Sequence, residues 1–301
     1  MKKLFKGKYE WGLFIKILSM LVVLVSVTFS WFVFAKDSWV NPFEVGVVGV
    51  VNVEVSNEGN EDSDWSNKVV YNPDEELGSF TEFSGNGERL YVPIVERQTI
   101  TGFYLPDYSE REKDFIEIDT YFKTNGAVKL FLDSASSISP YDENNPKDYI
   151  AGAVRVAFLV EDHLPIIWAP NPNYEFKDGE IIKDGDVESS YQYVYEETGK
   201  EFIDTSEENF VVIPTNGKSA GVSEDKRFMW GNPKDIENYY ESVNPIFKTS
   251  KPREGEEVIV KVTIRVWVEG YDREANKELI GGKIRMNLKF TAENNGSGGA
   301  N

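Results

Sequence analysis

The strongest constraint on the fold is a stretch near the end of the chain in which every second residue is apolar. In 257–269 (EVIVKVTIRVWVE), the apolar positions are Val258, Val260, Val262, Ile264, Val266 and Val268. Because successive side chains of a strand point to opposite faces, one whole face of this strand must be buried. The stretch 283–291 (KIRMNLKFT) repeats the pattern. Two such strands predict a sandwich of two sheets in which 257–269 is a central strand.

Shorter alternating stretches supply the other strands. The segments 114–124 and 128–132 flank an Asn125-Gly126 turn and are predicted to pair as a hairpin. The valine-rich stretch 43–55 is predicted to be an extended strand with a bend at its glycines. Further strands are expected at 90–94, 99–105, 153–161, 189–195 and 210–213, and a second hairpin at 174–183.

Two short helices are expected among these strands. In 232–243, Asn232 suits the N-cap and Pro233 the first helical turn. In 272–279, Asp272 suits the N-cap, and two glycines follow the helix.

Many short strands with one or two helices predict an all-β fold: a jelly-roll-like two-sheet sandwich with short helical insertions. This domain is expected to span 35–295, with an insertion around 170–251. A flexible Gly/Ser tail is expected at 296–301.

One long apolar segment precedes the β region. Residues 13–34 (LFIKILSMLVVLVSVTFSWFVF) carry a single charge, at Lys16. As a helix rising about 1.5 Å per residue, they would cover the roughly 30 Å hydrocarbon core of a bilayer. The flank 1–12 is rich in lysine, which places it in the cytoplasm and the rest of the chain outside. The sequence therefore predicts an N-terminal hydrophobic helix and an extracytoplasmic domain.

The apolar segment has two interpretations. Its uninterrupted length exceeds the ~7–15-residue apolar core of a secretory signal, which favours a retained transmembrane anchor. Small or tolerated residues before Ser30 and Ala35 would instead let a signal peptidase cut after either of them. Both interpretations stay open, and they predict a membrane-anchored protein or one secreted to the cell surface.

Composition narrows the classes of function. The first 35 residues contribute +4, so the net charge of −19 becomes −23 for 36–301. Such an acidic region argues against nucleic acid, which is bound through Lys and Arg. The chain has no cysteine, which excludes disulfides and thiolate metal sites. It has one histidine, His163, so catalytic triads and multi-histidine zinc sites are restricted or excluded.

Short motifs at the two ends of the chain resemble one family. At the start, TFSWF at 28–32 is followed by NPFEVG at 41–46. Near the end, VTIRVWVEG at 262–270 is followed by Asp272 and by GGK at 281–283. These motifs resemble SipW-dependent exported proteins of Gram-positive bacteria, the TasA/camelysin group. The resemblance is faint between the two ends.

The resemblance implies a jelly-roll domain that is exported through a dedicated signal peptidase and forms biofilm-matrix fibres. In some members an N-terminal strand is lent to the next subunit, and here 31–34 and 43–55 occupy that donor position. An apolar extended segment can be buried against a neighbour's open sheet edge. The implied partners are copies of itself or related surface subunits. The unbroken apolar run through Phe34 departs from the family pattern, and an uncleaved copy would stay tethered.

No metal ligand, cofactor-binding residue or catalytic residue is assigned. His163 stands beside Glu161 and Asp162 without an HExxH motif, and zinc proteases need at least two histidines, so it is expected to be a loop residue. The acid-rich stretches 60–64 (NEDSD) and 184–188 (DGDVE) are the best calcium candidates. Neither has the glycine that a 12-residue calcium loop requires at its sixth position.

Two surface features are candidates for recognition. The aromatic side chains that could stack on sugars, or else fill the core, are Tyr191, Tyr193, Tyr195, Trp168 and Trp230. If the last two strands pair, their outward cations form a basic patch, comprising Lys261, Arg265, Lys283, Arg285 and Lys289. This patch could receive the acidic stretch 57–64 of another copy. The alternative is pairing within the domain with Glu257 and Glu269, at ~0.2–1 kcal/mol per pair.

Taken together, the sequence predicts a non-enzymatic cell-surface or biofilm-matrix protein, either a fibre subunit or a membrane-tethered member of a TasA-like system. The alternative is a tethered extracytoplasmic binding module for glycan or calcium.

Overall fold

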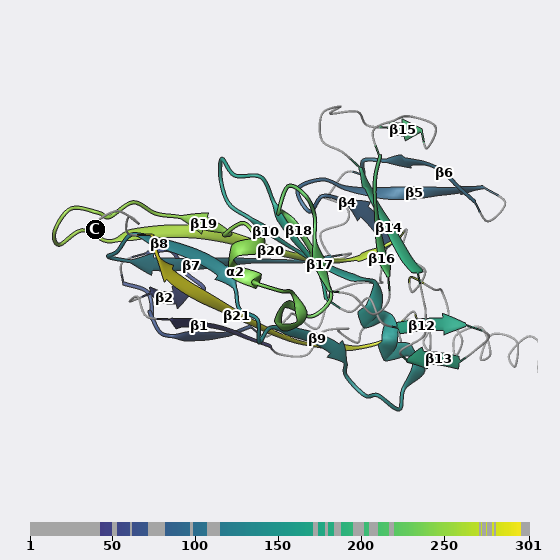
Figure 1. The fold of residues 1–301 in the computed structure, drawn as a ribbon, viewed down its shortest axis with the longest axis horizontal. Coiled ribbons are helices and arrows are strands. Elements are labelled where there is room, and N and C mark those ends of the chain that lie inside the picture. The colour runs from purple at the N-terminus through teal and green to yellow at the C-terminus, as the bar shows by residue number, and fades with distance from the viewer. Residues whose placement is uncertain are drawn as a thin grey trace, which may run out of the picture. The chain divides into compact units, whose positions relative to one another are not determined.

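Figure 1 shows the computed structural model of the chain. The described residues are 43–49, 53–60, 62–71, 82–96, 99–106, 115–170, 174–177, 180–183, 188–194, 202–204, 210–216, 220–270, 272, 275, 279 and 281–295. All of them belong to one compact unit, Ser38–Asn301. The predicted flank 1–12, apolar segment 13–34 and tail 296–301 lie outside the described residues. Within those residues, no helix is both long and apolar enough to cross a bilayer.

The first of two mixed sheets, sheet A, has the order β19–β8–β21–β1–β3, with β9 beside β21. Its strands are β19 (Phe247–Lys248), β8 (Val128–Leu132), β21 (Ile284–Asn294), β1 (Phe43–Gly49), β3 (Lys68–Tyr71) and β9 (Ser137–Pro140). β1 runs parallel to β21, with Val45 opposite Leu288. The first described strand therefore lies in the interior of its sheet, directly beside the last one.

The second sheet, sheet B, is built around β20, which lies between β7 and β10 as predicted for a central strand. Its main strands are β2 (Val53–Ser56), β7 (Ile116–Thr124), β20 (Val258–Glu269), β10 (Val154–Leu159), β11 (Ile166–Ala169), β18 (Phe228–Trp230) and β17 (Gly221–Val222). The end of β20 also pairs with β4 (Glu82–Gly85), which is followed in the pairing order by β5 (Leu90–Glu96), β6 (Thr99–Tyr104) and β15 (Phe202–Asp204).

Most of the remaining short elements lie in the expected insertion around 170–251. Two antiparallel hairpins join β12 (Tyr174–Lys177) to β13 (Glu180–Lys183) and β14 (Glu188–Val194) to β16 (Phe210–Asn216). The first of these hairpins confirms the pairing predicted for 174–183. The described helices are two 3₁₀ helices, Pro146–Ala153 and Pro233–Asp235, and the single-turn α2 (Tyr239–Ser242).

The main core combines inward side chains of both sheets, as expected for a β-sandwich. Phe290 of β21 packs edge-on against Phe122 of β7 and Phe158 of β10, with ring centroids 5.1 and 5.6 Å apart. The predicted alternation of β20 is correct, because Val262, Ile264, Val266 and Val268 are all buried. Burying such side chains contributes roughly 1.5–3 kcal/mol each, so this layer is the main source of stability.

The opposite face of sheet B carries a second buried cluster. Trp267 of β20 and Ala157 of β10 pack with Phe83 and Leu90 from the β4–β5 segment. Also on β10, the Arg155 guanidinium forms an ion pair with Asp272, and each side chain is only 2% exposed. Sequence alternation alone predicts one buried face and missed this second one.

The predicted hairpin of 114–124 with 128–132 is wrong. Both segments are strands, but β7 belongs to sheet B and β8 to sheet A, so the Asn125-Gly126 turn carries the chain across the sandwich. The bend predicted within 43–55 is confirmed in the same sense: β1 lies in sheet A and β2 in sheet B.

The predicted helix 232–243 is interrupted. Asn232 does cap the first turn by accepting from the Lys234 amide at 3.2 Å. Asn238 then adopts a left-handed conformation (φ 49°), which separates that turn from α2. Most of the predicted helix 272–279 lies outside the described residues. Asp272 pairs with the Arg155 side chain.

Candidate functional site

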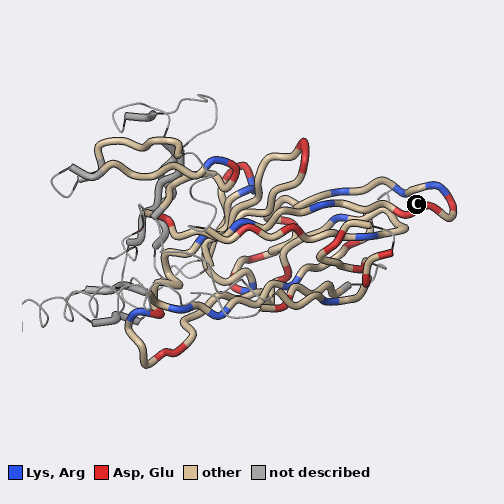
Figure 2. Tube along the Cα trace, turned by 180° about the vertical axis from the view of Figure 1, so that it is seen from behind, with Lys and Arg blue, Asp and Glu red and all other residues tan. Residues whose placement is uncertain are grey.

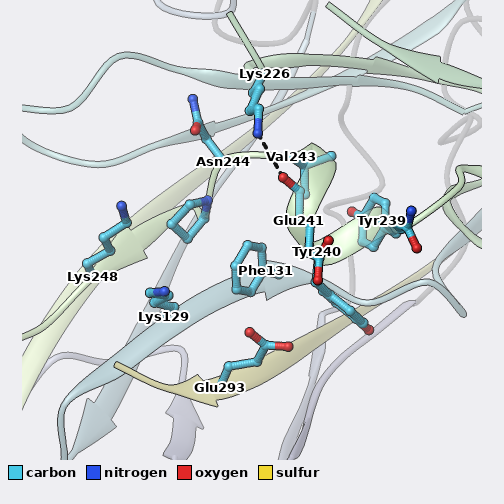
Figure 3. Close-up of a pocket in the computed structure, with 12 residues that line it drawn as sticks. Lys129, Phe131, Lys226, Tyr239, Tyr240, Glu241, Val243, Asn244, Lys248 and Glu293 are labelled. Carbon is cyan, nitrogen blue, oxygen red and sulfur yellow. Dashed lines mark hydrogen bonds between the residues drawn. The ribbon is translucent and has the colours of Figure 1, made fainter. Parts of the chain in front are cut away.

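The clearest candidate is an open hollow of about 580 Å³ on the outer face of sheet A (Figure 3). The face is set by β8, whose Lys129 and Phe131 alternate with residues buried in the main core. The segment that follows Asn238 forms the opposite wall. The lining is completed by Lys226, Tyr239, Tyr240, Glu241, Val243, Asn244, Pro245, Lys248 and Glu293.

Aromatic packing and backbone hydrogen bonds hold this wall against the sheet. The ring of Tyr240 meets Phe131 edge-on, with centroids 5.5 Å apart. The Tyr240 hydroxyl lies 3.2 Å from Thr291 Oγ1 and donates to Asp133 Oδ2 at 3.4 Å. The Ile246 amide donates to the Leu130 carbonyl at 2.7 Å. The wall is therefore fixed to β8 and β21, and the hollow is a preformed feature of the fold.

The electrostatic character of the hollow comes from its lysines. Lys248 of β19 stands directly opposite Lys129 of β8, and Glu293 of β21 stands on the other side of Lys129. Among the described residues, no carboxylate lies within 4.0 Å of either the Lys129 or the Lys248 amino group. A third lysine, Lys226, donates to the Glu241 carbonyl at 2.8 Å. Within the described part of the chain, these two adjacent cations thus form no ion pair.

The basic patch predicted on the last two strands is wrong, because β20 and β21 belong to different sheets and do not pair. Lys261 instead pairs with Asp119 of β7 at 2.7 Å, and Arg265 pairs with Glu117. The hydrogen bond that Lys261 donates to the Asp119 carboxylate raises the pKa of Lys261. Figure 2 shows Lys and Arg interleaved with Asp and Glu along the described strands.

The partners expected within the domain also differ from those observed. Glu257 approaches Lys123 at 3.8 Å, and the buried Glu269 carboxylate accepts from the Trp267 indole at 3.3 Å. From β21, Arg285 donates to the Tyr141 carbonyl at 3.2 Å and lies over its ring. Pairing within the domain is therefore the rule on β20, but with partners from β7.

The metal candidates remain isolated. His163 is exposed in the β10–β11 turn, and its Nδ1 lies 2.8 Å from the Glu161 carbonyl oxygen. In the calcium candidate 60–64, the Ser63 amide donates to the Asn60 carbonyl at 3.2 Å. Residues 184–187 lie outside the described residues. The described part of the chain contains no group of three or more His, Asp or Glu side chains able to hold a metal ion.

Of the aromatic candidates for sugar stacking, Trp168 belongs to the core. It is buried, and its indole donates to the Gly231 carbonyl at 2.9 Å. Trp230 is half-buried and packs against Gly221. The side chains of Tyr191 and Tyr193 on β14, and all of Tyr195, lie outside the described residues.

Sequence reasoning missed the lysine hollow. Lys129 and Lys248 are far apart in the chain, and neither belongs to a motif. Only the pairing of β8 with β19 brings them together.

Comparison with known proteins adds no relative, because no protein-family model, curated protein or solved structure matches this chain. The resemblance of the two chain ends to an exported family therefore rests on the quoted motifs.

Proposed function

We propose that this chain is an exported, non-enzymatic structural protein of the cell surface, with a jelly-roll variant of the sandwich as its body. It acts as a fibre subunit or as a membrane-tethered member of such an assembly. The apolar segment 13–34 delivers it across the membrane, and signal peptidase either releases it or leaves it anchored.

The position of β1 is the observation that carries this proposal. β1 is the first described strand after the apolar segment, and its Phe43 and Val45 are buried in the main core. It is hydrogen-bonded to β21 on one side and to β3 on the other. A pull on the segment before β1 is therefore resisted by two rows of backbone hydrogen bonds that run across the strand. This arrangement suits a domain that resists a pulling force applied at its N-terminal side.

The expected donor strand has to be revised. The stretch 43–55 forms β1 and β2, which pair within the chain, so it is not available for a neighbour in this conformation. A lent strand would have to come from 31–34, which lies outside the described residues. Among the described strands, β3 pairs only with β1, and its other edge is the acceptor we propose.

Fractionation and sedimentation test the function. The exported protein is expected in the membrane or cell-surface fraction, and detergent-free material is expected to sediment as oligomers or fibres visible by electron microscopy. N-terminal sequencing then identifies the form: Trp31 or Lys36 after cleavage, or the intact leader if it is retained. Full-length protein free in the cytosol, or a purified chain that stays monomeric at every concentration tested, would refute the proposal.

The lysine hollow favours a second candidate, a tethered module that binds an anionic glycan. In that case the chain is a monomer whose melting temperature rises with an acidic polysaccharide, because a ligand that binds only the folded state stabilises it. The same melting assay with calcium tests the alternative in which the tethered module binds calcium.

A further inference from the structure

We propose that the hollow at Lys129 and Lys248 receives the acidic β2–β3 loop, 57–64, of a second copy of this chain. This inference rests on the proposed assembly function and names a contact between copies in addition to the lent strand. The loop side chains that meet the lysines are Glu58, Asp62 and Asp64.

Neither lysine forms an ion pair with a carboxylate of the described residues. Like charges directly opposite each other on neighbouring strands are destabilising, and Lys129 and Lys248 occupy such positions. The nearest lining carboxylates are those of Glu241 and Glu293, and neither lies within 4.0 Å of the pair. The chain carries 51 acidic and 32 basic residues. Acidic residues are therefore plentiful, yet none among the described residues forms an ion pair with Lys129 or Lys248.

Several other basic side chains of the described residues do form ion pairs. Each of several basic side chains has a carboxylate partner within 4.0 Å, namely Lys68, Lys123, Arg227, Lys261 and Arg265. Lys129 and Lys248 differ from these side chains in having no ion partner among the described residues, and they differ from other unpaired lysines in standing directly opposite each other on neighbouring strands.

The β2–β3 loop carries the complementary charge in a fixed shape. Val55 and Ser66 exchange two backbone hydrogen bonds of 2.7 and 3.1 Å, and the Val47 amide donates to the Asn67 carbonyl at 2.9 Å. These bonds tie the loop to both sheets. Its Glu58, Asp62 and Asp64 are exposed, and none of the three has a cation within 4.0 Å among the described residues. A preformed loop binds with a smaller loss of entropy than a flexible one.

The two surfaces lie at opposite edges of sheet A. The loop leads into β3 at one edge, and the hollow lies over β8 and β19 at the other. A contact between two different surfaces is heterologous, so each added copy presents a new free hollow or a new free loop. Such a contact extends into a row or closes into a ring. A second copy explains the hollow better than a free polymer does, because both halves of the contact stand on the same chain.

The test is charge reversal followed by a charge swap in the full-length chain, purified in detergent. K129E/K248E and E58K/D62K are each expected to weaken association about tenfold or more in sedimentation velocity, because each places like charges in contact. Mixing the two variants, or combining all four changes in one chain, should restore association. A matched control, K147E/K234E, alters two exposed lysines that also lack an ion partner and should associate like the unchanged protein.

Cross-linking with a zero-length carbodiimide, applied to a mixture of isotope-labelled and unlabelled chains, gives a direct readout. The proposal predicts intermolecular links from Glu58 or Asp62 to Lys129 or Lys248. Association of K129E/K248E at the unchanged strength would overturn the docking site while leaving the assembly function intact. Loss of association without rescue by the swap would overturn the second copy as occupant and point to another anion. An unchanged protein that never associates would refute the assembly function as well.

Discussion

Two pairs of neighbouring strands, β7–β20 in sheet B and β8–β19 in sheet A, place their outward charges in opposite arrangements. On sheet B, the cations of β20 face acids of β7 across the strands, as in Lys261–Asp119 and Arg265–Glu117. On sheet A, Lys129 faces Lys248. Opposite charges at such positions contribute ~0.2–1 kcal/mol, and like charges are destabilising. The β7–β20 contact of sheet B thus pairs its charges within one chain, whereas the β8–β19 contact of sheet A places two lysines side by side.

The largest expected change in stability comes from breaking the buried ion pair between Arg155 and Asp272. Asp272→Asn removes the carboxylate of a buried ion pair with the Arg155 guanidinium, which is 2% exposed, so the free energy of unfolding should fall by about 3–5 kcal/mol. Urea denaturation measures the change. The control is Asp119→Asn, which removes an exposed pair and should cost less than about 1 kcal/mol. Equal effects of the two variants would mean that burial does not distinguish these pairs.

The next effect breaks the pairing on sheet B. Lys261→Glu places a third carboxylate beside Asp119 and Glu117, and we expect a loss of about 1 kcal/mol at low salt. Because Lys261 and Asp119 are both exposed, most of the loss should disappear in 1 M salt, where the Debye length is about 3 Å. Denaturant unfolding at both salt concentrations measures this, and a loss that persists in high salt would indicate a packing defect.

The same change on sheet A should act in the opposite direction. Lys248→Glu replaces a repulsive pair with an attractive one across β8 and β19, so the isolated chain should gain about 0.2–1 kcal/mol in stability. It should at the same time lose association through the hollow. A destabilised Lys248→Glu variant would mean that the two lysines do not repel, and the comparison between the faces would lose its basis.

The smallest effect is a pH dependence near the hollow. Burial tends to raise the pKa of Asp225, but hydrogen bonds from Ser223, the Arg227 amide and the Arg227 guanidinium outweigh it and lower the pKa below 3.8. A lowered pKa in the folded state stabilises the fold above about pH 4, and this contribution is lost as the pH falls further. Asp225→Asn should flatten the acid limb of the stability curve. Ser223→Ala, which removes one of these bonds, should flatten it only in part.

Strand identity was largely readable from the sequence, whereas strand pairing was not. The alternation in β20 and β21 fixes which side chains are buried, and the structure agrees. The same local pattern around Asn125-Gly126 fits a hairpin and a crossing between sheets equally well, since both bury Ile116, Phe122 and Leu130. Only contacts with distant strands decide between the two.

The lysine hollow could not be predicted from the sequence either, because it too depends on which strands pair. The predicted basic patch assumed that the last two long strands pair, and the cations of β20 proved to be matched by acids of β7 instead. Lys129 and Lys248 meet through a two-residue strand that no periodicity could have revealed. The Arg155–Asp272 pair shows the limit of alternation in another way, because a charged residue on β10 occupies a fully covered position.

The pairing of β1 with β21 has a consequence for the timing of folding. In a chain that emerges N-terminus first, β1 is among the first strands to appear and β21 is the last. Until residues 284–294 arrive, Phe43 and Val45 have no cover from their longest neighbour, and the middle of sheet A cannot close. Pairing between distant segments is slow, and uncovered strands invite aggregation. Sheet A can therefore close only after residues 284–294 have been made, and a chaperone would have this interval in which to act.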